Sequence, residues 1–99
     1  MSNWYILNKD NVPVRMEMLA ANIWLMAENK KVALDKVNGK TISTVFLGLD
    51  PSYGDGPPML FETMIFEAGE VVGEMDRYST WDQAVDGHNA IVAKVKEDK

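Results

Sequence analysis

The chain of 99 residues contains no cysteine and only one histidine. Without cysteine it can form no disulfide, no thiolate metal site and no thiol nucleophile. A zinc site built on a single histidine would need several carboxylates beside it, which is an uncommon arrangement. We therefore expect neither a metal ion nor a cofactor.

Long apolar runs and a basic leader are also missing. Residues 1–11 lack the basic start and apolar run of a secretory signal peptide. No stretch approaches the roughly 20 apolar residues that are needed to cross a bilayer. These absences favour a soluble protein of the cytoplasm that makes no membrane contact.

Positive charge is scarce in the middle of the chain. The net charge is −5, and residues 41–93 hold nine acidic residues against Arg77 alone, a balance of −8. Nucleic-acid binding needs clustered lysine and arginine, so direct contact with nucleic acid is not expected. The acidic stretch is either a set of solvated strand and loop faces or a surface for a basic protein partner.

The sequence does contain the periodicities of both strands and helices. Its length predicts one domain spanning residues 1–99. Asn38-Gly39 predicts a two-residue hairpin turn. Strands are expected at 4–8, 31–37, 40–49, 59–67 and 75–79, with a brief return strand around Pro13, a turn or frayed segment at 68–74, and helices at 15–29 and 80–97. The expected fold class is α+β, with a mostly antiparallel meander of four to five strands and two amphipathic helices packed on the sheet.

The two expected helices differ in pattern. At the start of helix 80–97, Thr80 and Gln83 have capping-box spacing. In helix 15–29, an apolar stripe at i, i+3, i+4 spacing is expected to face the core; it consists of Met16, Leu19, Ala20, Ile23, Trp24 and Ala27. Met18, Leu25 and Met26 lie outside this stripe, and uncovered apolar residues of this kind are typical of a contact surface.

The loop DPSYGDGPP, residues 50–58, is stiffened by proline. Its start resembles a calcium loop, but Gly54 stands at the third ligand position and Phe61 at the position of the glutamate. Tyr53 and Asp55 are candidate partner contacts, because an aromatic held on a stiff loop loses little entropy on binding. Alternatively, Tyr53 folds back over the core.

Candidate chemistry centres on His88. It is either a general base beside Asp50 or Glu62, or a histidine at the core edge bonded to a backbone carbonyl or a tyrosine. No nucleophile motif accompanies it. Arg77 is the expected ion-pair partner of Glu62 in a structural role. The alternative to an interaction protein is thus a small enzyme or ligand-binding protein that uses His88, Asp50 and Glu62 near the loop.

The blocks TVFLGLD, GPP, LFETMIF and RYSTWDQAVDGH, in this order, resemble a set of small uncharacterised proteins encoded by bacteriophages and prophages. In that group a histidine often follows the aspartate of LGLD, whereas this chain has Pro51. The resemblance implies an accessory protein of the bacterial host cytoplasm and brings no known activity or catalytic residues. We expect a non-enzymatic interaction module whose partner is a host protein, a phage protein or a second copy of the chain as a homodimer.

Overall fold

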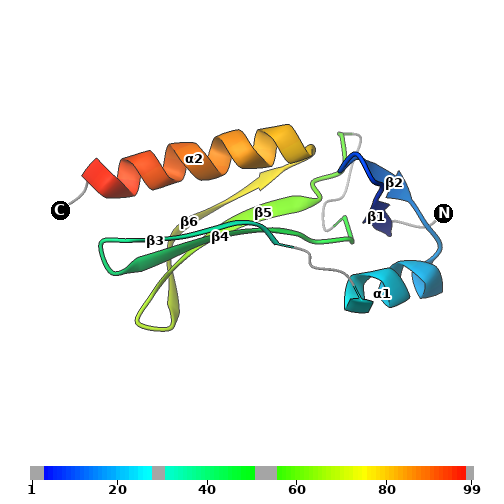
Figure 1. Ribbon diagram of the computed structural model, residues 1–99, viewed down its shortest axis with the longest axis horizontal. Helices are drawn as coiled ribbons and strands as arrows, with labels where there is room; N and C mark the ends of the chain where they lie inside the picture. The colour runs from blue at the N-terminus through cyan, green and yellow to red at the C-terminus, as the bar shows by residue number, and fades with distance from the viewer. Residues whose placement is uncertain (1–3, 28–30, 51–55, 98–99) are drawn as a thin grey trace.

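The computed structural model describes residues 4–27, 31–50 and 56–97, apart from the side chain of Glu74. Strands β3 to β6 form one antiparallel sheet in the order β3-β4-β5-β6, and β1 and β2 form a separate two-stranded sheet (Figure 1). This α+β architecture with an antiparallel meander agrees with the expected fold class. The elements are β1 (Tyr5–Leu7), β2 (Pro13–Arg15), α1 (Met18–Ala27), β3 (Lys31–Val37), β4 (Lys40–Phe46), β5 (Phe61–Glu67), β6 (Glu70–Tyr78) and α2 (Trp81–Glu97).

Two tight turns set the register of the meander. Asn38 and Gly39, with φ of 51° and 79°, join β3 to β4 as predicted. Ala68 and Gly69, with φ of 52° and 82°, join β5 to β6 in the same way. The expected turn or frayed strand start at 68–74 is therefore confirmed as a turn at 68–69 and wrong for 70–74, because β6 already begins at Glu70. Alanine rarely adopts positive φ, so its turn signal in the sequence is weaker than that of asparagine.

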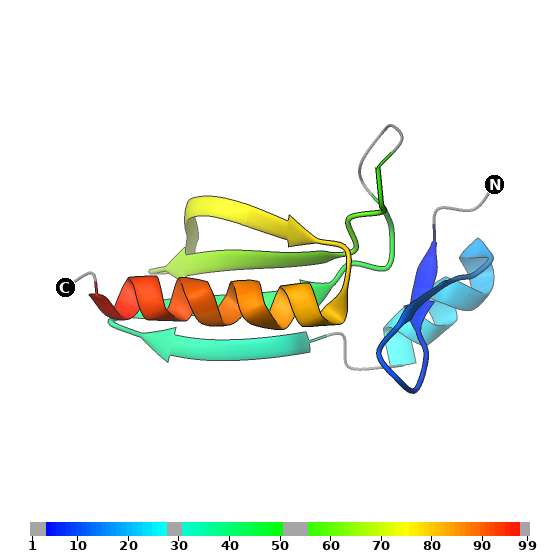
Figure 2. The same ribbon diagram turned by 90° about the horizontal axis from the view of Figure 1, so that it is seen from above.

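Helix α2 covers one face of the four-stranded sheet (Figures 1 and 2). Its predicted capping box is formed: the Gln83 backbone N–H donates to Thr80 Oγ1 at 3.1 Å, and the Thr80 N–H donates to Gln83 Oε1 at 3.3 Å. Near the other end, Asn38 Nδ2 donates to the Val95 carbonyl oxygen at 3.0 Å. The β3–β4 turn therefore holds the last turn of the helix.

Alternate residues of β4 and β5 face α2 and build the core. Ile42, Phe46 and Phe61 on this face are at most 1% exposed. An aromatic row crosses the end of the sheet, with ring centroids 5.9 Å apart for Trp24–Phe46, 5.3 Å for Phe46–Phe61 and 6.3 Å for Phe61–Trp81. This row connects α1 to α2 through the two central strands.

Helix α1 lies beyond the end of the four-stranded sheet and packs on β1, on the side away from α2 (Figures 1 and 2). The expectation that both helices cover the sheet is therefore wrong for α1. The helix begins at Met18, not at residue 15, because Glu17 Oε1 accepts a hydrogen bond from the Ala20 N–H at 3.2 Å. Of the two described helices, α2 alone covers the sheet.

The buried side of α1 also differs from the expected stripe. Leu19 and Ile23, expected in the core, are 66% and 61% exposed. Trp24, which the stripe includes, packs against the core as expected, and Leu25, which lies outside the stripe, also packs against it. A Cβ placed on Gly48 would lie 2.6 Å from Leu25 Cδ1. Leu25 is thus not the free contact residue that the sequence suggested. The sequence MLAANIWLMA is apolar on every side, so its periodicity does not select one face.

The predicted pair of Glu62 and Arg77 is present. These residues are cross-strand partners on β5 and β6, and Arg77 Nε lies 2.8 Å from Glu62 Oε2. Glu62 is 7% exposed, whereas the Arg77 side chain remains 43% exposed. The pair lies on the face of the sheet opposite α2, where it neutralises the one acidic group that this face buries.

Gly87, in the middle of α2, is required by a close approach. A Cβ at this position would overlap the ring of Tyr78, whose hydroxyl is buried and has no hydrogen-bond partner among the described residues. Gly87→Ala should therefore destabilise the protein by about 1–3 kcal/mol through overpacking, although alanine normally stabilises a helix interior by about 1 kcal/mol. Urea unfolding measures the change.

The matched control is Asn89→Ala on the exposed side of the same helix, which should change stability by less than about 0.5 kcal/mol. In a Tyr78→Leu background, Gly87→Ala should no longer lower the free energy of unfolding. Equal costs of Gly87→Ala in both backgrounds would show that the ring of Tyr78 is not what excludes a side chain here.

Candidate functional site

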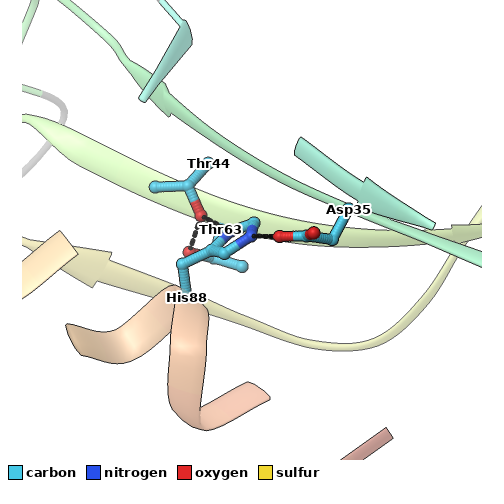
Figure 3. Close-up of polar contacts among 4 residues, drawn as sticks. All are labelled: Asp35, Thr44, Thr63 and His88. Atoms are coloured by element: carbon cyan, nitrogen blue, oxygen red, sulfur yellow. Dashed lines mark hydrogen bonds and ion pairs between the residues drawn. The ribbon is translucent and has the colours of Figure 1, made fainter. Parts of the chain in front are cut away.

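The His88 side chain projects from α2 onto the middle of the sheet, where it connects three strands (Figure 3). Its Nε2 lies 2.7 Å from Asp35 Oδ2 on β3, and its Nδ1 lies 2.7 Å from Thr44 Oγ1 on β4. Thr44 Oγ1 in turn lies 2.5 Å from Thr63 Oγ1 on β5. We call Asp35, His88, Thr44 and Thr63 the polar relay.

The chemistry of the four groups gives the relay a direction. The Asp35 carboxylate only accepts, so His88 Nε2 carries a hydrogen. When the ring is neutral, Nδ1 is an acceptor, and in this form Thr44 donates to His88 and Thr63 donates to Thr44. Every donor in the polar relay is satisfied, and the relay ends on Asp35, whose side chain is 51% exposed. The polar relay therefore places two hydroxyls and an imidazole in an apolar core without an unpaired donor.

This arrangement has the order of a nucleophile, base and orienting acid, but it offers no room for a substrate. Thr44 and Thr63 are 0% exposed and His88 is 1% exposed. A reacting carbonyl or phosphoryl group could not reach Thr44 Oγ1 without moving α2 off the sheet. The geometry thus supports a structural role for the relay.

The predicted combination of His88 with Asp50 or Glu62 is not formed. The carboxylate beside His88 is that of Asp35, while Glu62 pairs with Arg77 on the opposite face of the sheet. Asp50 Oδ1 accepts a hydrogen bond from the Met59 N–H at 3.4 Å, which joins the two ends of the Gly/Pro loop. The expectation of a carbonyl or tyrosine partner for His88 is also wrong, because its partners are a threonine and an aspartate.

Asp35, Thr44 and Thr63 were not predicted as site residues from the sequence. A signal was present, because each threonine stands between two apolar residues on that face, Ile42 and Phe46 on β4 and Phe61 and Ile65 on β5. Their pairing across β4 and β5 could be read only once the register was known. Tyr53 and Asp55, the predicted loop contacts, lie outside the described residues.

One open groove of about 570 Å³ lies between the C-terminal half of α2 and strands β5 and β6. Its floor is aliphatic, and its rim carries Lys40, Lys94, Glu67 and Asp76. Two cations beside two anions favour no single class of charged ligand, and no relay residue lines the groove. Within residues 4–27, 31–50 and 56–97, no group of three or more metal-binding side chains occurs.

The face of the sheet opposite α2 is a second candidate site. No described helix or strand packs on it. The pairing register gives this face six apolar side chains, of which Leu34, Val71 and Met75 are 44%, 46% and 47% exposed. We call it the uncovered sheet face, made of Leu34, Val45, Met64, Phe66, Val71 and Met75.

Helix α1 adds a second exposed apolar surface. Met18 and Met26, both predicted as contact residues, are 60% and 89% exposed, and Leu19 and Ile23 lie between them on the helix surface. We call these four residues the α1 row. Because α1 lies on the side of the sheet away from α2 (Figure 1), both apolar surfaces belong to the half of the molecule opposite α2.

Comparison with protein-family models, curated proteins and solved structures finds no match to this chain. The similarity to phage-encoded proteins consequently stays an expectation based on the sequence. Neither helix in the described part of the chain is long and apolar enough to span a lipid bilayer.

The direction of the relay predicts unequal effects of its two threonines. Thr44→Val removes both the donor to His88 and the acceptor of Thr63, which should cost about 2–4 kcal/mol. Thr63→Val leaves only a spare lone pair on Thr44 and should cost about 1 kcal/mol or less. The double variant should be more stable than Thr44→Val alone, because it leaves no unpaired hydroxyl hydrogen. Urea unfolding of the three variants measures these differences.

Thr41→Val serves as the control, since Thr41 lies on β4 but on the opposite face, and its cost should be below about 0.5 kcal/mol. Equal and additive costs at Thr44 and Thr63 would contradict the direction assigned to the relay.

Proposed function

We propose that this protein is a non-enzymatic protein–protein interaction module that docks through the uncovered sheet face, with the α1 row beside it. The observation that carries the proposal is a four-stranded sheet with six apolar side chains on a face that no described element covers. Apolar surface of this extent on a small domain is typical of a contact site.

The remaining features of the molecule support docking over catalysis. The only imidazole is 1% exposed and fully used by the polar relay. The groove beside α2 has a rim of mixed charge and contains none of the relay residues. Methionine, present as Met64 and Met75 on the sheet face and as Met18 and Met26 on α1, adapts its shape to different contact surfaces.

The setting we propose follows from the resemblance to phage and prophage proteins. In that setting the module acts in the cytoplasm of a bacterial host, and its partner is a host protein, a phage protein or another copy of itself. Among the described side chains, the acidic residues of α2 and β6 remain on the other side of the molecule, where they keep the module from nucleic acid.

Affinity capture from bacterial lysate tests the proposal when three baits are compared. Met64→Lys places a charge at the centre of the uncovered sheet face and should lose most of what the unchanged chain captures. Ala93→Lys adds the same charge on the exposed side of α2 and should capture the same proteins as the unchanged chain. Quantitative mass spectrometry of the eluates provides the comparison.

Circular dichroism of Met64→Lys confirms that the variant is folded before capture. Identical eluates from all three baits would contradict docking through this face. A loss with Met26→Lys but not with Met64→Lys would move the contact to the α1 row.

A further inference from the structure

We propose that the occupant of the uncovered sheet face is a second copy of this chain, so that two sheets pack face to face in a homodimer. This inference rests on the proposed function and names its partner. Three observations carry it: the area of the face, the distribution of charge and the state of the sheet edges.

The uncovered sheet face and α1 together offer about the area that a stable dimer interface needs. Four strands of about seven residues span a flat area of roughly 450 Å², from a strand spacing of about 4.8 Å and a rise of about 3.4 Å per residue. The ten residues of α1 add roughly 150 Å². Accessible area exceeds flat area because side chains make the surface rough, so the sum approaches the roughly 800 Å² per partner of a standard interface.

The charges also favour contact between two copies through this face. The chain carries a net charge of −5, so two copies repel each other wherever their acidic sides meet. The described acidic side chains that are exposed on α2 and on the α2 side of the sheet are Asp35, Glu67, Glu70, Asp76, Asp82, Asp86 and Glu97. Face-to-face packing places these groups on opposite outer surfaces of the dimer, roughly 20 Å apart on the sheets and roughly 30 Å apart on the helices, which exceeds the Debye length of about 8 Å at physiological salt.

The uncovered sheet face itself carries little charge. Glu62 is neutralised by Arg77 at 2.8 Å, and Lys31 and Lys36 lie at the outer margin on β3. A basic partner would meet these cations and is disfavoured here. A second copy brings a centre of valine, leucine, methionine and phenylalanine, which is the composition that face-to-face sheets bury between them.

The edges of the sheet disfavour edge-to-edge pairing, which is the other way in which two sheets can join. Strand β3 carries two lysines and a register shift between Lys31 and Ala33, and β6 has a register shift opposite the segment Thr63 to Ile65. Charged residues and bulges at edge strands prevent edge-to-edge pairing. The two edges are therefore protected against pairing with another sheet, whereas the uncovered sheet face between them has no such protection.

The pair of Glu62 and Arg77 makes this face compatible with a cover. Here Glu62 lies at 7% exposure and is already paired, so further covering of the face by another protein leaves no unpaired charge inside the interface.

Sedimentation equilibrium of the full chain between about 1 and 500 µM tests the inference. The expected result is a concentration-dependent shift from the monomer mass to twice that mass. Met64→Lys should weaken the dimer by at least about 30-fold, the loss typical of a residue at the centre of an interface. Ala93→Lys, which adds the same charge on α2, should leave the dimer unchanged.

A second measurement covers the case in which Met64→Lys does not fold. Ser43 is the cross-strand neighbour of Met64 on the same face, and the chain has no cysteine of its own. The thiol of Ser43→Cys should react with an alkylating reagent several-fold more slowly at dimer-forming concentration than in dilute solution. The thiol of Asn89→Cys on the outer side of α2 should react equally fast in both.

The outcomes separate this inference from the proposed function. A monomer at every concentration overturns the homodimer, while face-dependent capture of another protein would still support the interaction module. A dimer that tolerates Met64→Lys and leaves the Ser43→Cys thiol fully reactive overturns the inference as well, because the two copies then meet elsewhere. A dimer lost with Met64→Lys and a protected thiol support it.

Discussion

The packing of α2 against one face of the β3–β6 sheet is the contact on which the rest of the structure depends. The helix is held at its start by the capping box, at its middle by the polar relay and at its end by Asn38. In the part of the chain that the structure describes, α2 is the one long helix, and the shorter α1 packs on β1 beyond the end of the sheet. A sheet has two faces, so the same contact that builds the core leaves an apolar face that no described helix or strand covers.

We interpret the polar relay as the feature that fixes where α2 sits along the sheet. Thr44 and Thr63 would be costly in an apolar core if they lacked a partner, and His88 satisfies them only at this height on the strands. A shift of the helix by one turn, about 5.4 Å, would separate the imidazole from both Thr44 and Asp35. Buried polar networks of this kind select one packing arrangement over similar ones when every member is satisfied.

Local signals in the sequence predicted much of the fold. Asn38-Gly39, the Thr80–Gln83 capping box and the pairing of Glu62 with Arg77 depend on neighbours in sequence or on strand alternation, and all three are formed. The strand start at Glu70 was missed because Ala68 is an unusual turn residue.

The orientation of α1 and the partners of His88 could not be predicted from such local signals. The sequence of α1 is apolar on all sides, so only the space beside Phe46 and Gly48 decides that Trp24 and Leu25 turn inward. Asp35 lies 53 positions before His88, and nothing short of the strand register brings them together. Side chains that meet through tertiary packing leave no periodic pattern in the sequence.

The central claim, that the uncovered sheet face becomes buried between two copies, can be tested in the unaltered chain through its methionine methyl groups. With a soluble paramagnetic agent present, the relaxation of the Met64 and Met75 methyls reports solvent access to the face, and Met59 near Ser79 serves as a reference away from it. We predict that the relaxation enhancement of Met64 and Met75 falls as protein concentration rises, while that of Met59 stays constant. Unchanged enhancement at Met64 and Met75 up to the highest concentration would contradict the account.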